Sequence, residues 1–332
     1  MVDGVNLGVG EADFIVCKDV VHKTHSLLIE EDLVARILCV VNHVCTHAVN
    51  LSIVSGNQIY LGDNLPVLQS MPDESFQLIY IDPPFNTGRS QVRTNRESKQ
   101  SQTGGSVGFG GKRYEQVVSS VLSYDDEFAD YWGFLESRLR EAWRLLKDSG
   151  TLYLHLDYRE SHYAKVLLDA LFGRECFLNE IIWAYDYGGK AKNRWPAKHD
   201  NILVYVKNPK TYYFNSEAVD REPYMAPGLV TKEKAERGKL PTDVWWHTIV
   251  SPTGKEKTGY PTQKPLGILR RIISASSQEG DRVLDFFAGS GTTGHAAFEL
   301  GRHFTLIDQL EESVELVAKR LSDLGAKFEL KR

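Results

Sequence analysis

The chain has 332 residues, of which 42% are hydrophobic and 25% are charged, and its formal net charge is −5. This length suffices for one large domain or two modest ones, and the composition is that of an ordinary globular protein. It argues against a membrane protein, because no apolar run approaches the ~20 residues that a membrane span requires, and we expect no secretory signal.

The four cysteines form neither a CxxC pair nor a zinc-binding spacing; they are Cys17, Cys39, Cys45 and Cys176. We therefore expect reduced thiols in a cytoplasmic protein, and no metal site.

Positive charge is concentrated in two parts of the chain. Residues 186–271 contain 16 lysines and arginines against 9 acids, and residues 88–123 contain 6 against 2. The rest of the chain is therefore strongly acidic. Such a separation suits a protein that presents one face to a polyanion, although basic runs also occur on surfaces that face only water.

The first predicted elements follow an N-terminal stretch, residues 1–50, that we interpret as a peripheral helical extension. Residues 57–63 predict a short strand, and residues 64–75 a short helix and turn with Asn64 as its N-cap. Residues 76–81, "FQLIYI", form a continuous apolar run. Such a run is typical of a strand buried on both faces of a parallel sheet.

A stretch of different composition, residues 88–123, comes next. It is rich in Gly, Ser, Gln and basic residues and has little apolar periodicity, which predicts a mobile loop. A loop of this length inside a compact domain is usually functional or disordered.

Strands and helices alternate through most of the remaining chain. The patterns predict a helix over 127–150 that ends near Gly150, a strand over 151–157, a helix over 160–173, strands over 179–185 and 201–208, a helix over 262–277, a strand over 281–287, a helix over 290–300, a strand over 303–308 and a helix over 310–324. This alternation predicts an α/β fold with a doubly wound sheet. We divide the chain into residues 1–50, 51–185, 186–260 and 261–332.

The apolar strand ends in "IDPPFNTG", residues 81–88. Neither proline has an N–H to donate, so the segment cannot continue a strand ladder, and its backbone angles are restricted. Asp82, Pro83, Pro84 and Phe85 therefore place a carboxylate, two carbonyls and an aromatic ring on a stiff strand end.

A second motif, "LDFFAGSGTTGHAA" at residues 284–297, reads as a strand, a glycine-rich turn and the start of a helix. Gly289 and Gly291 allow a sharp turn and the close approach of a ligand, and the free N–H groups of the helix start favour an anionic group. Asp308 ends the next strand, where an acid can accept hydrogen bonds from ribose hydroxyls. Together these features predict a site for a nucleoside cofactor.

In this order the two motifs resemble the β class of the S-adenosylmethionine-dependent DNA amino-methyltransferases. That family carries an (Asn/Asp/Ser)-Pro-Pro-aromatic tetrad and a Phe-x-Gly-x-Gly turn, and in its β class the catalytic half precedes the cofactor half. "YPTQKPLGILRRII" also resembles the helix that precedes the cofactor strand. The resemblance covers residues 57–322. It implies a Rossmann-like methyltransferase sheet with permuted motif order.

The resemblance also implies roles for the tetrad. The Asp82 carboxylate and a prolyl carbonyl, taken as that of Pro83, accept hydrogen bonds from an exocyclic amine and free its lone pair for methyl transfer, while Phe85 stacks on the base. A base in a duplex must first be flipped out.

The cofactor implied by the resemblance is S-adenosylmethionine. Asp63 is expected to receive its adenine amine, Asp308 its ribose hydroxyls, and Lys264 to lie close to the cofactor or to a substrate phosphate. The implied cofactor-binding residues are Asp63, Lys264, Asp285, Phe286, Phe287, Ala288, Gly289, Ser290, Gly291, Thr292, Thr293 and Asp308.

The basic, aromatic residues 186–260 are the candidate target-recognition region, and the loop at 88–123 is a candidate for closing over the extruded nucleotide. The alternatives are a loop without a direct role, and Trp245 or Trp246 as core residues. The candidate DNA-binding residues are Arg89, Arg93, Lys190, Lys192, Arg194, Trp195, Trp246 and His247.

We therefore expect a DNA adenine-N6 methyltransferase, because aspartate in the first tetrad position favours adenine in this family and serine favours cytosine N4. Cytosine-N4 methylation is the alternative, and methylation of RNA or protein glutamine a more distant one. A non-catalytic subunit is disfavoured because the acids and glycines of both motifs are present. Expected partners are double-stranded DNA, a second copy in a homodimer and a cognate restriction endonuclease, in the cytoplasm of a prokaryotic cell at the nucleoid.

Overall fold

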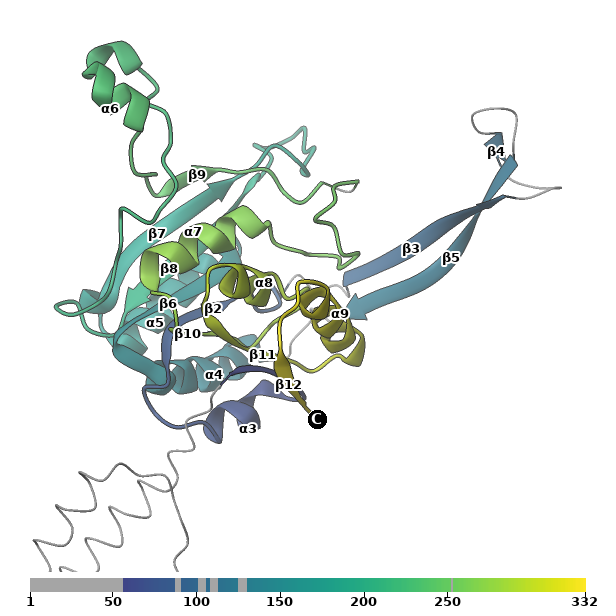
Figure 1. Ribbon diagram of the computed structural model, residues 1–332, viewed down its shortest axis with the longest axis horizontal. Coiled ribbons are helices and arrows are strands. Elements are labelled where there is room, and N and C mark those ends of the chain that lie inside the picture. The colour runs from purple at the N-terminus through teal and green to yellow at the C-terminus, as the bar shows by residue number, and fades with distance from the viewer. Residues whose placement is uncertain (1–55, 87–90, 101–105, 108–112, 125–129, 252) are drawn as a thin grey trace, which may run out of the picture. The chain divides into compact units, whose positions relative to one another are not determined.

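The computed structural model describes residues 56–332 apart from 87–90, 101–105, 108–112, 125–129 and 252 (Figure 1). The chain forms two compact units, Met1–Ser55 and Gly56–Arg332, and the described residues belong to the second. The predicted N-terminal extension, residues 1–50, lies outside the described residues.

A nine-stranded sheet organises the second unit, with the strand order β12-β1-β11-β10-β2-β6-β8-β7-β9 (Figure 1). Its strands are β1 (Asn57–Leu61), β2 (Phe76–Ile81), β6 (Leu146–Asp157), β7 (Phe177–Ala184), β8 (His199–Val206), β9 (Val244–Trp246), β10 (Arg282–Asp285), β11 (His303–Asp308) and β12 (Phe328–Lys331). The strands from β12 to β6 are all parallel, and β8 is antiparallel to both β6 and β7. The α/β prediction is confirmed.

Helices cover both faces of this sheet. The α-helices are α3 (Asn64–Gln69), α4 (Tyr131–Leu145), α5 (Ser161–Phe172), α6 (Lys232–Arg237), α7 (Leu266–Ser276), α8 (Thr292–Glu299) and α9 (Glu311–Asp323), and the 3₁₀ helices are η2 (Arg174–Cys176) and η3 (Pro227–Leu229). Apolar residues of α7, α8 and α9 form one buried cluster with the sheet, and those of α3, α4 and α5 form another. β2 contributes Leu78 and Tyr80 to the first cluster, and Ile79 and Ile81 to the second. Its continuous apolar run therefore reflects burial on both faces.

The loop predicted at residues 88–123 is wrong where the structure describes it. This stretch contains β3 (Gln91–Gln100), β4 (Ser106–Val107) and β5 (Arg113–Tyr124), which form a separate antiparallel sheet with the order β3-β5-β4. Strand pairing satisfies backbone N–H and C=O groups whatever the side chains are, so a polar composition did not prevent it.

Two further boundaries differ from the predictions. The helix expected to run to Gly150 ends at Leu145, because Leu146 has an extended backbone and begins β6. The N-cap of α3 is Asp63, whose side chain accepts a hydrogen bond from the N–H of Leu65, and Asn64 is the first helical residue.

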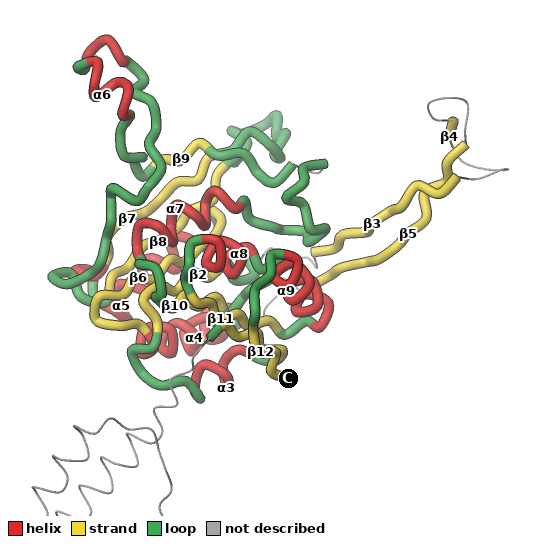
Figure 2. The backbone as a smooth tube through the Cα atoms, in the orientation of Figure 1, coloured by secondary structure: helices red, strands yellow, loops and turns green. Residues whose placement is uncertain are grey.

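Residues 186–260 are not a separate domain. They contribute β8 and β9 to the main sheet, and Figure 2 shows most of the remaining residues as loops around the short α6. Within the described part of the chain, every helix is too short or too polar to cross a bilayer.

Candidate active site

Both sequence motifs lie at the same edge of the sheet. β2 and β10 are adjacent and parallel, with Ile79 opposite Leu284, although about 200 residues separate them. Asp82 follows the end of β2, and Asp285 ends β10. The neighbouring β11 is parallel as well and ends at Asp308. In α/β sheets ligands bind outside the carboxyl ends of the strands, which is where these acids converge.

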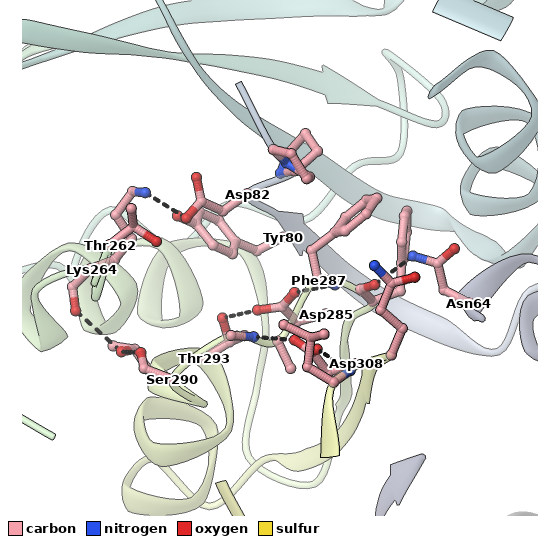
Figure 3. A pocket seen from close by; sticks show the side chains of 18 of the residues that line it. Asn64, Tyr80, Asp82, Thr262, Lys264, Asp285, Phe287, Ser290, Thr293 and Asp308 are labelled. Atoms are coloured by element: carbon pink, nitrogen blue, oxygen red, sulfur yellow. Dashed lines mark hydrogen bonds and ion pairs between the residues drawn. The ribbon is translucent and has the colours of Figure 1, made fainter. Parts of the chain in front are cut away.

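One cavity at this edge is lined by residues from both motifs (Figure 3). The predicted site residues among its lining are Asp82, Pro83, Pro84, Phe85, Lys264, Asp285, Phe286, Phe287, Ala288, Gly289, Ser290, Thr292, Thr293 and Asp308. Asp63 and Gly291 are not part of the lining, although Gly62 and Asn64 are.

The two glycines of the turn have left-handed backbones, with φ of +51° at Gly289 and +71° at Gly291. A Cβ atom at Gly289 would come within 3.1 Å of a ring carbon of Tyr260, which lines the cavity. At Gly291, the N-cap of α8, a Cβ atom would lie 3.0 Å from methyl carbons of Val317. Both conformation and space therefore require glycine, as the turn motif suggested.

Asp285 is a buried carboxyl group under the turn. It accepts hydrogen bonds from the hydroxyl of Thr293 at 2.5 Å and from the N–H of Phe287 at 3.0 Å. Burial raises the pKa of Asp285 to about 7, although these hydrogen bonds act in the opposite direction. The group can therefore exchange a proton near neutral pH.

Asp308 orders the turn through the backbone. Its two oxygens accept hydrogen bonds from the N–H groups of Gly289 at 2.8 Å and Leu310 at 3.0 Å. Burial raises the pKa of this carboxyl group as well. Carboxylate oxygens can accept more than one hydrogen bond, so Asp308 retains capacity for a hydroxyl group in the cavity.

Asp82 has two different oxygen environments. Oδ2 lies 2.5 Å from the Nζ atom of Lys264. Oδ1 is buried and has no hydrogen-bond partner among the described residues. A buried acceptor without a partner is costly, and its presence in a cavity indicates a place for a donor from a ligand.

Asp63 is held by a residue that the sequence patterns did not indicate. Arg138 of α4 donates to Asp63 at 2.8 Å and to the side-chain oxygen of Asn64 at 2.5 Å. Asn64 in turn donates to the carbonyl of Phe286 at 2.7 Å. Asn64 and Arg138 line the cavity beside the glycine turn, so they join α3 and α4 to the cofactor side. Asp63 itself lies behind them.

A buried polar network borders the tetrad and was also missed. The hydroxyl of Tyr80 contacts Nδ1 of His155 at 2.7 Å, and Nε2 of His155 lies 3.1 Å from a carboxylate oxygen of Asp200. Tyr185 donates to the other Asp200 oxygen at 3.0 Å. Although burial opposes it, the contact with His155 and other partners lowers the pKa of Asp200, while burial raises that of Tyr80. Tyr80 lines the cavity.

Several candidate DNA-binding residues leave the sheet at the same edge as Asp82. Since β8 is antiparallel to both β6 and β7, β7 runs parallel to β6 and β2, and β9 is parallel to β7. Residues that follow the carboxyl ends of β7 and β9 therefore lie on this edge. They are Lys190, Lys192, Arg194 and Trp195 after β7, and Trp246 and His247 at the end of β9.

Exposure separates the two tryptophans of β9. Trp245 is buried in the core, whereas Trp246 is 73% exposed. Trp195 is 95% exposed, and Lys190, Lys192 and Arg194 are exposed as well. The side chain of Arg93 in β3 is not described, and Arg89 lies outside the described residues. The described chain contains no cluster of three histidines, cysteines or acids arranged to hold a metal.

Comparison with known proteins agrees with this geometry. A family model described as DNA methylase matches residues 76–319. The DNA adenine methyltransferase YhdJ of Escherichia coli (strain K12) is 31% identical over 268 residues, which are 78% of this chain and 81% of that protein. The type II methyltransferase M.HpaI of Haemophilus parainfluenzae is 31% identical over 258 residues, which are 77% of this chain and 71% of that protein.

Solved structures share the fold. The DNA modification methylase TTHA0409 of Thermus thermophilus, complexed with S-adenosyl-L-methionine, matches 83% of this chain and 98% of its own, with a TM-score of 0.52 and 21% identity. The cytosine-N4-specific PvuII DNA methyltransferase matches 83% of this chain and 95% of its own, with a TM-score of 0.54 and 15% identity.

Proposed function

The chain belongs to the DNA methylase family, and on that premise we propose that it transfers a methyl group from S-adenosylmethionine to the exocyclic N6 amine of adenine in double-stranded DNA. The observation that carries the proposal is the position of Asp82. Its Oδ1 atom, a buried acceptor without a partner among the described residues, lines the same cavity as the glycine turn. The adenine-specific name of a relative at 31% identity supports adenine over cytosine.

The cavity residues fit S-adenosylmethionine. When bound, this cofactor supplies an electrophilic methyl group on a sulfonium centre. Gly289 keeps the wall beside Tyr260 open, Asp308 faces the cavity as an acceptor for ribose hydroxyls, and Asp285 lies under the turn where the cationic methionine part would lie. Asn64 and Arg138 replace Asp63 as the side chains of that region that line the cavity.

The tetrad orients the amine that is methylated. The lone pair of an exocyclic amine is delocalised into the base, so the amine is a weak nucleophile. Asp82 Oδ1 and the carbonyl of Pro83 accept its two N–H bonds and favour a tetrahedral nitrogen, whose lone pair then displaces the thioether from the methyl carbon. The methylated nitrogen loses one proton, and the sulfonium becomes a neutral thioether. Phe85 provides a ring on which the base stacks.

Exposed basic and aromatic residues on the same edge support contact with DNA. Lys190, Lys192 and Arg194 suit phosphate groups, whose contacts give binding a steep salt dependence. Trp195 and Trp246 present large rings next to them. Extrusion of the target base costs a few kcal/mol, which such contacts would offset.

Other features of the system stay predictions. The type II methyltransferases among the relatives support a role beside a cognate restriction endonuclease. A homodimer and a location on the nucleoid in the cytoplasm rest on the family resemblance alone.

A nucleoside assay tests the proposal. Unmethylated DNA is incubated with purified protein and labelled S-adenosylmethionine, digested, and separated so that N6-methyladenine and N4-methylcytosine are distinguished. We expect only N6-methyladenine, and N4-methylcytosine as the product would refute the adenine assignment. Single-molecule sequencing of the product gives the recognition sequence.

Substitution of the tetrad acid tests its assigned role. Asp82→Ala should lower the transfer rate at least about 100-fold, since it removes a preorganised acceptor. The affinity for S-adenosylmethionine should change little. Asp323→Ala, at an exposed acid of α9, is the control and should keep full activity. Full activity of Asp82→Ala would contradict the role.

A further inference from the structure

Lys264 connects the catalytic and cofactor sides of the cavity through three contacts (Figure 3). Its Nζ atom lies 2.5 Å from Asp82 Oδ2 and 4.9 Å from the ring centroid of Phe85. Its backbone carbonyl accepts a hydrogen bond from the hydroxyl of Thr292 at 3.1 Å. Thr292 is the first residue of α8, directly after the glycine turn.

The ion pair with Asp82 is shielded from water. The side chains of Lys264 and Asp82 are only 9% and 17% exposed. Charges interact more strongly in such an environment than in bulk water, and removing one partner leaves the other buried and uncompensated. The contact therefore constrains the orientation of the Asp82 carboxylate.

The backbone of Lys264 is itself restricted. It precedes Pro265, whose ring excludes helical backbone angles at the preceding residue. Thr292 holds the Lys264 carbonyl from the other side and is itself contacted by Ser290 at 3.0 Å and by Arg320 at 3.1 Å. The ammonium group is thus presented to Asp82 from a stiff attachment.

We propose that Lys264 is a positioning residue for methyl transfer. By occupying Asp82 Oδ2, it turns the carboxylate so that Oδ1 is the acceptor left for the amine of the extruded base. This inference rests on the proposed function and assigns Lys264 a role different from that of a cofactor ligand. Its contact with Phe85 places the same ammonium group beside the ring that stacks on the base, so both base-binding groups depend on it.

Two competing roles predict different measurements. A cofactor ligand would change mainly the affinity for S-adenosylmethionine. A purely structural lysine would change the stability of the protein but not the rate at which folded protein transfers the methyl group. A positioning residue changes the rate at saturating cofactor and DNA.

The experiment compares Lys264→Met, Lys264→Gln and Lys264→Arg with the wild type. Lys319→Met, at an exposed lysine of α9, is the matched control. For each protein we would measure the melting temperature, the dissociation constant of S-adenosylmethionine by calorimetry, and the single-turnover rate of methyl transfer. Lys264→Gln keeps a polar side chain and serves if Lys264→Met does not fold.

We expect Lys264→Met and Lys264→Gln to lose about 100-fold in the single-turnover rate, as misplaced catalytic groups do. The dissociation constant of S-adenosylmethionine should change less than about threefold, and Lys264→Arg should recover part of the rate because it keeps a charged donor. Equal rates for wild type and Lys264→Gln, or a loss confined to cofactor affinity, would overturn the proposal alone. No transfer by the wild type or Lys319→Met would instead refute the proposed function, and the role of Lys264 with it.

Discussion

The buried carboxyl group of Asp285 makes stability dependent on pH in a defined direction. Its pKa is raised from 3.8 to about 7 in the folded protein. Below about pH 4 the group is protonated in both the folded and the unfolded chain, and its contribution to stability is complete. As the pH rises through 7, the folded chain must bury a carboxylate, and that contribution is lost.

The size of the effect follows from the two pKa values. Each unit of difference corresponds to about 1.4 kcal/mol, so the whole effect is on the order of 4 kcal/mol. Roughly half of it, about 2 kcal/mol, should be lost between about pH 5.5 and pH 8.5. Asp285→Asn replaces the group by an amide of the same shape that does not titrate.

Urea denaturation of both proteins without cofactor, at about pH 5.5 and about pH 8.5, checks this value. The free energy of unfolding of the wild type should fall relative to that of Asp285→Asn by about 2 kcal/mol between the two conditions. Other titrating groups are present in both proteins and cancel in the difference. A difference that is the same at both pH values would refute the reasoning.

Two further predictions concern stability. Gly291→Ala should lower the free energy of unfolding by more than the about 1–2 kcal/mol of a left-handed backbone, because its Cβ atom meets Val317, whereas Gly325→Ala, with φ of +81° and open space, should show the backbone cost alone; equal losses in urea denaturation would contradict this. Trp245→Ala should lose about 3–5 kcal/mol as a buried residue. Trp246→Ala should stay within about 0.5 kcal/mol of the wild type and weaken DNA binding in a fluorescence anisotropy titration; wild-type DNA affinity would remove Trp246 from the proposed interface.

The central strands could be predicted from sequence because their environment is recorded in their own residues. The predicted bounds of β2 and β11 are those observed, and both are apolar runs buried between two helix layers. β9 and β12 could not be predicted in this way, since they have only three and four residues and contain exposed side chains. Their pairing partners, and not their own pattern, place them in the sheet.

The same distinction applies to the site. The tetrad and the glycine turn could be predicted because their chemistry requires unusual residue types in a fixed local order. Arg138 contacts Asp63 across 75 positions, and His155 contacts Asp200 across 45. No local pattern marks either arginine or histidine as part of a site, so both required the fold to be known. Lys264 was expected near the cofactor or the substrate, and its contact with Asp82 could not be derived from its neighbours in the chain.

The central position of β2 has a consequence for synthesis on the ribosome. One edge of this strand pairs with β6, which follows it after about 65 residues, but its other edge waits for β10, which is made about 200 residues later. Until then a fully apolar strand has an open row of N–H and C=O groups, which is a template for pairing with other chains. The permuted order of the motifs thus leaves the growing polypeptide exposed to misassembly, and delays assembly of the active site until nearly all of the sheet has been made.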